Sequence, residues 1–313
     1  MTELAALRDA YRTDKAALLA QLGQAALRSV GVSRTLAKLT RLTDALLTQL
    51  WQRAALDASG GCLMAVGGYG RGELLPHSDV DVLVLLPDTT QLDQDTALQA
   101  KLEAFIGSCW DVGLEIGSSV RTLSQCLAES DKDITVQTAL LESRRITGQA
   151  QLAKTFAQAY TQAMDAQAFF TAKTLELRQR HTKYEDTPYA LEPNCKESPG
   201  GLRDLQIILW VAKAAGLGHT WDDLVQSGIA TALEATQLRR NEALLTCIRA
   251  RLHLVARRRE DRLVFDLQTA VAESFGMQLE TTPEGRLKLR ASEKLMREYY
   301  WAAKAVMQLN QIL

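Results

Sequence analysis

Two aspartates separated by one residue are the most chemically suggestive feature of the sequence. Asp79 and Asp81 open a segment rich in valine and leucine (79–86) that is typical of a buried β-strand. Positions i and i+2 of a strand share a face, so both carboxylates are expected to point the same way. Adjacent carboxylates are costly unless a divalent cation neutralises them, and carboxylate oxygens suit Mg²⁺. The pair predicts a metal site for Mg²⁺ or Mn²⁺, formed by Asp79 and Asp81.

A glycine-rich turn precedes the aspartates. A short apolar run (62–68) ends in Gly67 and Gly68, where the lack of a β-carbon lets backbone N–H groups approach an anion. The following residues are expected to form a helical turn whose start faces the same anion. Arg71 is predicted to contact phosphate, with a salt bridge to Glu73 or the sheet edge as an equal alternative.

The complete block reads Gly-Gly-x-Gly-Arg-Gly-Glu, then four residues, then Ser78-Asp79-x-Asp81. A nucleotide-binding turn beside two carboxylates suits nucleotidyl transfer, in which one metal ion holds the triphosphate and a second activates the attacking oxygen. A third acid on a neighbouring strand would complete such a site. Glu115 is the first candidate, because alternation in 113–122 separates it from Leu114 and Ile116; Asp111 is the second. A surface position on the strand is the alternative for Glu115.

A second candidate region is an irregular segment (185–201) that holds three prolines and two glycines within an otherwise helical stretch. Lys196 in this loop and Arg203 just after it are predicted to neutralise triphosphate charge. Gly200 and Gly201 are expected to open a helix with N–H groups directed toward phosphate. The alternative is an ordinary capped helix start beside a solvated loop.

The elements that must position these residues follow from the hydrophobic periodicity. Residues 1 to about 57 are expected to be helical, and Gly60-Gly61 ends that pattern. Three strands are expected at 62–68, 79–86 and 113–122, with a helix near 90–110. After about residue 125 the pattern is helical, apart from the 185–201 loop and a turn at 281–286. These patterns divide the chain into a helical region (1–57), a small core of strands and helices (58–150) and a helical domain (151–313).

Composition limits the alternatives. The formal net charge is -1 and no aromatic-basic stripe is evident, which argues against a nucleic acid substrate. The longest apolar run is too short to span a membrane, and the amino terminus does not resemble a signal peptide. Five scattered cysteines without a C-x-x-C pair indicate thiols in a reducing cytoplasm.

The glycine–aspartate block resembles the signature of the nucleotidyltransferase superfamily that includes DNA polymerase beta, and more closely that of the bacterial PII uridylyltransferases. The resemblance extends over residues 60–313. It includes a third catalytic strand (110–122), the helix after it (140–148), a distinctive motif (191–213) and closing helices (252–276 and 296–310). It implies an α+β fold: a polymerase-beta-like core with a small mixed sheet, flanked by N-terminal helices and a larger C-terminal helical domain that completes the cleft.

The resemblance also implies a reaction, namely transfer of UMP from UTP to a tyrosine of the trimeric PII signal protein with release of pyrophosphate. It places Gly67, Gly68, Ser78, Asp79 and Asp81 on the family's nucleotide and metal positions. The four histidines are not followed by aspartate, so the family's HD-type site for UMP removal is not expected in this sequence, nor are its glutamine-sensing domains.

Two other accounts share these residues. The same core serves adenylyl transfer to proteins, small molecules or RNA ends, and the glycine–aspartate block alone does not separate these acceptors from PII. A regulatory module that binds nucleotide without transfer would require a broken metal site, and Asp79 and Asp81 are both present.

Overall fold

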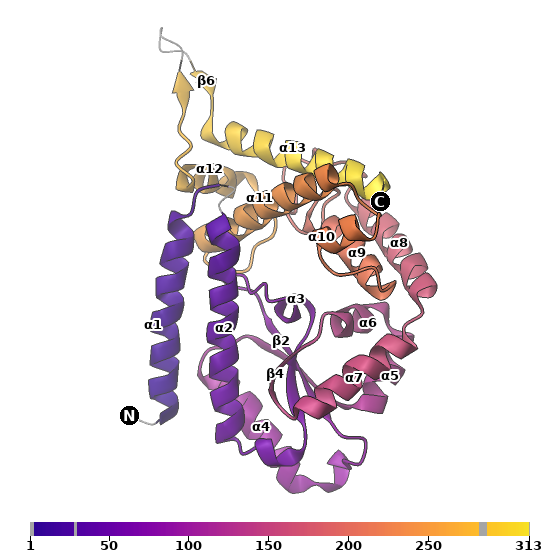
Figure 1. Ribbon diagram of the computed structural model, residues 1–313. Helices are drawn as coiled ribbons and strands as arrows, with labels where there is room; N and C mark the ends of the chain where they lie inside the picture. Colours follow the sequence, from indigo (N-terminus) through magenta and orange to yellow (C-terminus); the bar gives the residue numbers. More distant parts are fainter. Residues whose placement is uncertain (1–2, 28–29, 282–286, 313) are drawn as a thin grey trace. The chain divides into compact units, whose positions relative to one another are not determined.

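The computed structural model describes residues 3–27, 30–281 and 287–312 (Figure 1). The chain divides into two compact units, Met1–Leu18 with Leu36–Met164, and Leu19–Thr35 with Asp165–Leu313. Two long helices, α1 (Glu3–Gln24) and α2 (Val30–Arg53), contribute residues to both units. The expected helical region 1–57 is therefore not a separate unit, and the expected boundary near 150 falls instead after Met164, because the helix that follows residue 150 packs on the sheet.

The first unit is built on a four-stranded mixed sheet with the order β3-β2-β1-β4. Its strands are β1 (Cys62–Ala65), β2 (Val80–Leu86), β3 (Ile116–Thr122) and β4 (Arg144–Gly148). β2 and β3 are parallel, whereas β1 is antiparallel to both β2 and β4. A parallel pair needs a crossover connection, and α4 (Thr96–Asp111) supplies it between β2 and β3. The mixed sheet with flanking helices confirms the expected α+β class.

Burial explains why the central strand forms where it does. β2 lies between two other strands, and six of its seven residues are buried, so it reads as a continuous apolar run. Asp81 is the one exposed residue of β2. The strands expected at 79–86 and 113–122 are confirmed with slightly shorter bounds.

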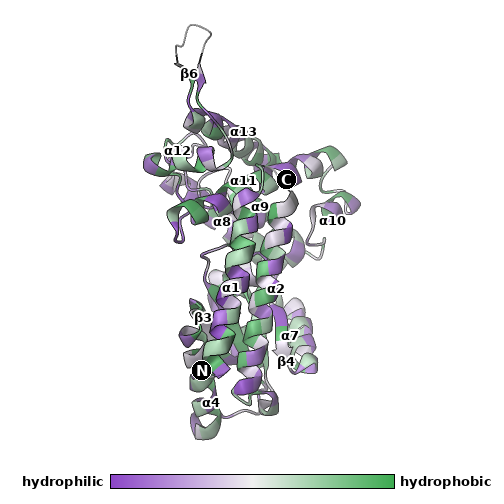
Figure 2. Cartoon of the chain, turned by 90° about the vertical axis from the view of Figure 1, so that its left-hand side faces the viewer, coloured by the Kyte–Doolittle hydropathy of each residue, from purple (hydrophilic) through white to green (hydrophobic). Residues whose placement is uncertain are grey.

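Helices complete the first unit. The remaining elements are η1 (Asp57–Ser59), α3 (Gly67–Gly70), η2 (Leu92–Gln94), α5 (Leu123–Lys132), α6 (Ile134–Leu141) and α7 (Ala150–Ala163). Helix α2 is amphipathic: Leu39, Leu46 and Leu50 are buried, whereas Arg41 is exposed. Figure 2 shows hydrophobic and hydrophilic residues alternating along this helix. Helix α7 packs against β1, β2 and β4.

The second unit is mainly helical. It contains α8 (Ala166–Lys183), α9 (Leu202–Ala214), α10 (Trp221–Gln226), α11 (Ala232–Ala256), α12 (Phe265–Ser274) and α13 (Ala291–Ile312), with the short strands β5 (Glu280–Thr281) and β6 (Leu287–Leu289). Its core is formed mainly by α9, α11, α12 and α13, and the helices agree with the helical pattern expected after about residue 125.

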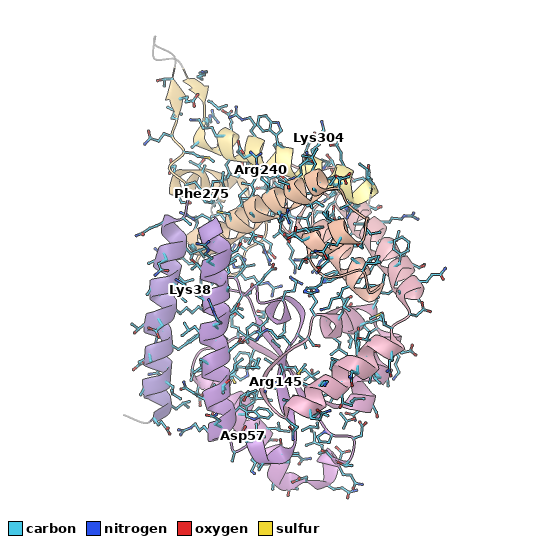
Figure 3. The ribbon with its side chains drawn as sticks, viewed as in Figure 1. Lys38, Asp57, Arg145, Arg240, Phe275 and Lys304 are labelled. Carbon is cyan, nitrogen blue, oxygen red and sulfur yellow. The ribbon has the colours of Figure 1, made fainter. Side chains whose placement is uncertain are left out.

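Arg251 of α11 ties several parts of this unit together. Its guanidinium donates to the carbonyl oxygens of Leu22, Ala25 and Ser274, and it lies 4.5 Å from the ring centroid of Phe275. Phe275 is labelled in Figure 3. The side chain is only 4% exposed, so these carbonyls replace the water that the cation has lost. One buried cation thus joins the end of α1 to α11 and α12.

Two sequence expectations need correction. Residues 140–148 were expected to be helical, but only Leu140 and Leu141 end α6, and Arg144–Gly148 form β4. β4 is an edge strand with no fully buried residue, so it lacks the apolar pattern that marks the other strands. The strands β5 and β6 were also not expected. Of the expected turn at 281–286, residues 282–286 lie outside the described residues. None of the helices within the described ranges is long and apolar enough to cross a membrane.

Candidate active site

Asp81 is the second residue of β2 and is exposed, whereas the other residues of this strand are buried. The Val66 N–H donates to the Asp81 carbonyl oxygen (3.0 Å), which joins the glycine-rich turn to β2. On the other side, Asp81 is the register partner of Gly117 on β3. A β-carbon on Gly117 would lie 2.5 Å from the Asp81 Oδ1 atom. The Asp81 carboxylate therefore occupies space that any other residue at position 117 would fill.

The glycine-rich turn approaches the same carboxylate. Gly67 has a φ of +56°, in the left-handed region that favours glycine. A helical turn was expected from Tyr69 to Leu75; the turn that forms, α3, spans Gly67–Gly70, so it begins two residues earlier and ends before Leu75. A β-carbon on Gly67 would lie 3.9 Å from the Asp81 Oδ2 atom. Gly67, which follows β1, and Gly117, which lies near the start of β3, are thus both next to the Asp81 carboxylate.

A pocket with a volume of about 390 Å³ opens beside this carboxylate. Asp81 and Gly67 contribute to its wall, and β3 contributes polar groups along its length. Helix α6 supplies an apolar side. The lining residues are Val66, Gly67, Asp81, Val82, Leu83, Gly117, Ser118, Ser119, Arg121, Val136, Ala139 and Leu140. The pocket combines a carboxylate, hydroxyls, a cation and an apolar surface, a mixture typical of small-molecule sites.

Tyr69 anchors the turn to its surroundings. The ring is 2% exposed, and its hydroxyl donates to Asp44 Oδ1 on α2 (2.5 Å). Asp44 also accepts two bonds from the Arg144 guanidinium on β4, at 2.8 and 3.1 Å. Burial, reinforced by the Asp44 charge, raises the pKa of Tyr69 well above its ordinary value, so the hydroxyl keeps its proton and stays a donor. Helix α2 therefore helps to fix the turn that precedes Asp81.

Thr40, one turn earlier on α2, makes a second attachment. Its hydroxyl donates to the Gly72 carbonyl (2.9 Å) and accepts from the Leu74 N–H (3.2 Å). The Thr40 hydroxyl also lies 3.1 Å from the Leu36 carbonyl oxygen. The N-terminal helices carried no diagnostic motif, yet α2 contacts the glycine-rich segment at two points.

Arg71 is held by two carboxylates. Its guanidinium forms ion pairs with Glu73 (3.2 Å) and with the nearly buried Glu142. Burial alone would lower the pKa of Arg71, but the charges of Glu73 and Glu142 outweigh it and raise the pKa. The salt bridge to Glu73 was one of the two expected roles. A contact between Arg71 and phosphate stays a prediction.

The remaining predicted acids lie close to the strand ends. Ser78 and Asp79 are partly buried in the turn before β2, so Asp79 precedes the strand by one residue. Glu115 lies one residue before β3, is exposed, and accepts the Val80 N–H through its backbone carbonyl (2.8 Å). Asp111 is the exposed last residue of α4.

Glu115 has an electrostatic neighbour on α1. Burial lowers the pKa of Lys15, and the Glu115 charge opposes that shift. Within the described ranges, no three side chains of histidine, cysteine, aspartate or glutamate gather as a metal site. The third carboxylate stays a prediction, with Glu115 and Asp111 as its candidates.

Lys196 and Arg203 lie in the second unit and are brought together there by Glu197. One Glu197 oxygen lies 3.4 Å from the Lys196 Nζ atom and 3.2 Å from the Arg203 Nη2 atom. Burial and the nearby Arg203 charge lower the pKa of Lys196. Burial would raise the pKa of Glu197, but Arg203 and Lys196 together hold it below its ordinary value. Glu197 is thus the present anionic partner of both predicted phosphate ligands.

Arg203 is further restrained by an aromatic ring. Its guanidinium carbon lies 5.0 Å from the Trp210 ring centroid, and the Lys173 Nζ atom lies 4.9 Å from the same centroid. Lys173 is 2% exposed and pairs with Glu176 (2.7 Å). Two cations therefore contact one indole, which fixes Arg203 more firmly than a surface arginine.

The 185–201 segment is an irregular loop, as expected, but the N–H groups of residues 200–203 already have acceptors within the protein. The Gly200 N–H donates to Asp204 (2.7 Å), and those of Gly201, Leu202 and Arg203 donate to carbonyls of residues 195–198. The loop folds back over the start of α9 and uses these donors itself. The expectation of an open anion-binding helix start here is therefore wrong.

Asp204 is the centre of that arrangement and was not predicted to be. Its carboxylate is fully buried and accepts from Arg180 (2.5 Å), from His181 (3.0 Å) and from Gly200. The Asn310 side chain donates to its backbone carbonyl. Burial would raise the pKa of Asp204, but His181 and Arg180 outweigh it and lower the pKa.

Comparison with known sequences agrees with this geometry. Residues 49–137 match the family described as the nucleotidyltransferase domain, and this range contains the glycine-rich turn, Asp79, Asp81 and Glu115. Residues 168–313 match the family described as GlnD PII-uridylyltransferase. That range contains Lys196, Arg203 and Asp204.

Curated relatives resemble the chain over nearly its whole length. A protein of Burkholderia orbicola is 56% identical over 98% of the chain, and one of Cupriavidus metallidurans is likewise 56% identical over 98%. A protein of Burkholderia lata is 58% identical over 91%. Each is named a bifunctional uridylyltransferase/uridylyl-removing enzyme. The chain spans about a third of the length of these relatives (32% to 34%).

Proposed function

Because this chain is homologous over nearly its whole length to bifunctional uridylyltransferase/uridylyl-removing enzymes and contains a nucleotidyltransferase domain, we propose that it transfers UMP from UTP to a tyrosine of the PII nitrogen-regulatory protein. One observation carries the proposal. Asp81 is the only exposed residue of β2, and it borders a pocket between the glycine-rich turn and β3 inside the matched nucleotidyltransferase range.

A divalent cation, Mg²⁺ or Mn²⁺, fits the donor set. Asp79 and Asp81 offer carboxylate oxygens, which these cations prefer, and Gly117 leaves the Asp81 carboxylate room where a β-carbon would intrude. Mg²⁺ commonly uses one or two carboxylates together with substrate phosphates and water, so two aspartates suffice as protein ligands. When bound, the cation would neutralise triphosphate charge during phosphoryl transfer. Glu115 is proposed as an additional ligand.

The groups of the chain would act by binding and orientation. Gly67 and Gly68 would bring backbone N–H groups to the triphosphate, and Ser78 would support the same turn. Lys196 and Arg203 are proposed to bind phosphate oxygens in place of Glu197. The phenolic oxygen of the acceptor tyrosine would form a bond to the α-phosphorus, the bond to pyrophosphate would break, and the phenol would lose its proton. Orientation of the reacting atoms supplies much of the rate.

Compartment and partners follow from the same proposal. The five cysteines form no disulfide, which supports a reducing cytoplasm as the site of action. The proposed partners are UTP and PII, with no nucleic acid or membrane.

The test is a transfer assay with the purified chain, Mg²⁺, PII and either UTP or ATP, read as the mass of PII. A gain of one UMP with UTP alone is expected. Asp81→Asn should reduce transfer by about 100-fold or more while the circular dichroism spectrum is unchanged. Asp93→Asn, at an exposed position of η2, is the matched control and should leave turnover unchanged. A gain with ATP would reassign the nucleotide, and wild-type turnover in Asp81→Asn would refute the metal site.

A further inference from the structure

A groove in the second unit lies apart from all predicted site residues of that unit. It runs along α13, beside residues 189–192 and the start of α12, and has a volume of about 620 Å³. Four large apolar side chains stand at its edges and are more than half exposed. They are Tyr189 (51%), Leu191 (68%), Phe265 (57%) and Trp301 (61%). Apolar side chains gathered this way on a surface mark an interaction site.

The charge of the groove is positive. Arg290, Arg297 and Lys304 line it and are exposed, whereas Glu293 is its one carboxylate among the lining residues. Glu293 accepts the backbone N–H of Arg290 (2.7 Å) at the start of α13. Positions 297, 301 and 304 lie three and four residues apart, so they share one face of α13.

Hydrogen bonds hold the walls of the groove in place. The Tyr300 hydroxyl donates to the Ala190 carbonyl (3.1 Å), which ties the loop to α13. The Gln268 amide donates to the Leu191 carbonyl (2.8 Å), and the Phe265 N–H donates to Glu192 (2.8 Å), which tie the same loop to α12.

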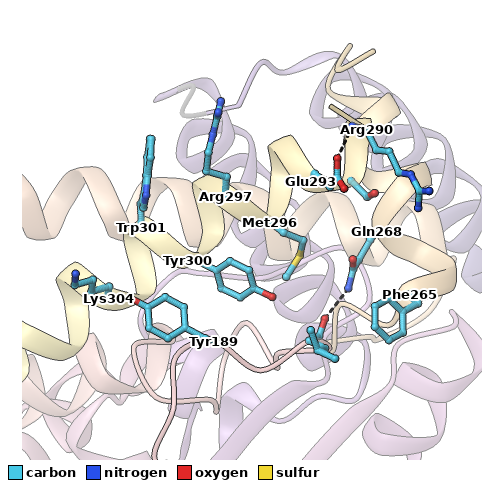
Figure 4. A pocket seen from close by; sticks show the side chains of 12 residues that line it. Tyr189, Phe265, Gln268, Arg290, Glu293, Met296, Arg297, Tyr300, Trp301 and Lys304 are labelled. Atoms are coloured by element: carbon cyan, nitrogen blue, oxygen red, sulfur yellow. Dashed lines mark hydrogen bonds between the residues drawn. The ribbon is translucent and has the colours of Figure 1, made fainter. Parts of the chain in front are cut away.

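Ring contacts add to this rigidity. Tyr189 and Tyr300 meet edge to face with centroids 5.7 Å apart, and the Arg297 guanidinium lies 5.4 Å from the Trp301 centroid. Figure 4 shows Arg297 and Trp301 extending side by side from α13, with Tyr300 and Tyr189 facing each other. A groove that is already ordered loses little entropy when it binds a partner.

The composition favours a protein partner. Tryptophan, tyrosine, phenylalanine, methionine and arginine are the residues enriched in the centres of protein–protein interfaces, and all five types line this groove. The large apolar side chains of the groove are more than half exposed, so the groove is open to solvent, which suits a protein segment better than an enclosed small molecule. Three cations against one carboxylate call for a partner segment that carries carboxylates around an apolar anchor.

We propose that this groove docks the protein acceptor of the reaction, PII, through an acidic segment with an apolar side chain that packs against Trp301. The identity of the partner rests on the proposed function, whereas the chemistry of the surface does not. None of the predicted nucleotide or metal ligands lines the groove. Docking there would therefore raise the affinity for the acceptor without changing the affinity for UTP.

The test compares Trp301→Ala and Arg297→Glu with Trp110→Ala. Trp110 is 56% exposed on α4, so its truncation removes a similar exposed indole from the first unit. PII binding is measured by calorimetry without UTP, and the KM values for PII and UTP are measured separately. Both groove variants should weaken PII binding and raise the KM for PII by about tenfold, with an unchanged KM for UTP. Trp110→Ala should behave like the wild type.

The outcomes separate this inference from the proposed function. If the wild type binds PII through the groove but transfers no UMP, the docking surface stands and the proposed function fails. If UMP transfer occurs and both groove variants keep the wild-type affinity and KM for PII, the function stands and the docking surface is wrong. A wild-type chain that does not bind PII also overturns the docking surface. The charge reversal at Arg297 provides an independent result should Trp301→Ala fail to fold.

Discussion

The Asp81 Oδ1 atom lies 2.5 Å from the point where a β-carbon would stand on Gly117. The two residues are register partners on the parallel strands β2 and β3. Glycine at position 117 therefore sets the position of the carboxylate, because any side chain there would push it away.

Gly117→Ala should reduce UMP transfer by about 100-fold, since the added methyl group displaces Asp81 from its productive position. The measurement is kcat/KM for transfer to PII. Gly107→Ala is the matched control: Gly107 is exposed in α4, and no atom lies within 4 Å of the added β-carbon. That variant should keep full activity and gain stability of up to about 1 kcal/mol. Wild-type turnover in Gly117→Ala would show that the carboxylate position is not critical.

Tyr69→Phe should lower the free energy of unfolding by about 1.5–3 kcal/mol, because it removes a hydrogen bond to the charged Asp44 carboxylate. It should also raise the KM for UTP, since the turn at Gly67 loses an attachment. Tyr11→Phe is the comparison, because Tyr11 and Thr43 share a bond between neutral groups (3.1 Å) and its loss should cost only about 0.5–1.5 kcal/mol. Urea denaturation measures both, and equal losses would contradict the role assigned to Asp44.

The Asp261 carboxylate should make the second unit sensitive to acid. Burial would raise the pKa of Asp261, but hydrogen bonds from His253 (3.3 Å) and Arg249 (2.5 Å) outweigh it and lower the pKa well below the ordinary value. A lowered pKa adds stability that is complete above the unfolded pKa, about 4, and is lost as the pH falls below it.

The urea midpoint of the wild type should therefore decrease progressively as the pH is lowered from about 4 to about 2. Asp261→Asn should cost about 3 kcal/mol at pH 7, because Arg249 loses its charged partner, and it should flatten this pH dependence. Asp266→Asn, at an exposed position of α12, should keep the wild-type slope. The same slope in both variants would remove Asp261 from the acid response.

The cysteines should not react in the folded protein. All five are buried, and burial raises the pKa of Cys62 to about 11 and the pKa of Cys109 and Cys126 to about 12. At pH 8 a thiol of pKa 11 is ionised in about one molecule in a thousand, so a disulfide reagent should react slowly. After denaturation in urea, five thiols should react rapidly. A fast-reacting thiol in the native protein would contradict the described burial.

Local patterns predicted the parts of the site that are close in sequence. Asp81 and Gly67 belong to one block, and the alternation in 79–86 placed Asp81 on the exposed face of its strand. The fold and the activity class were predicted from a resemblance to known families. The family matches of residues 49–137 and 168–313 confirm that resemblance.

Other features depend on partners far away in the chain. Tyr69 is fixed by Asp44, which lies 25 positions before it in the sequence. Asp44 is in turn bound by Arg144, which lies 100 positions after Asp44. No spacing rule connects such residues. The edge strand β4 was missed because its residues are not fully buried, and the start of α9 was misjudged because the loop supplies its own acceptors.

The bond between Asn310 and Asp204 has a consequence for synthesis of the protein. The Asn310 side chain reaches the Asp204 carbonyl across 106 positions (2.8 Å). The ribosome releases α9 well before α13 exists, so the backbone carbonyl of Asp204 emerges without this donor. Such distant closure is slow, so α9 lacks this hydrogen bond until residue 310 has been made. Chaperone binding to nascent chains should therefore end only after residue 310 has left the exit tunnel.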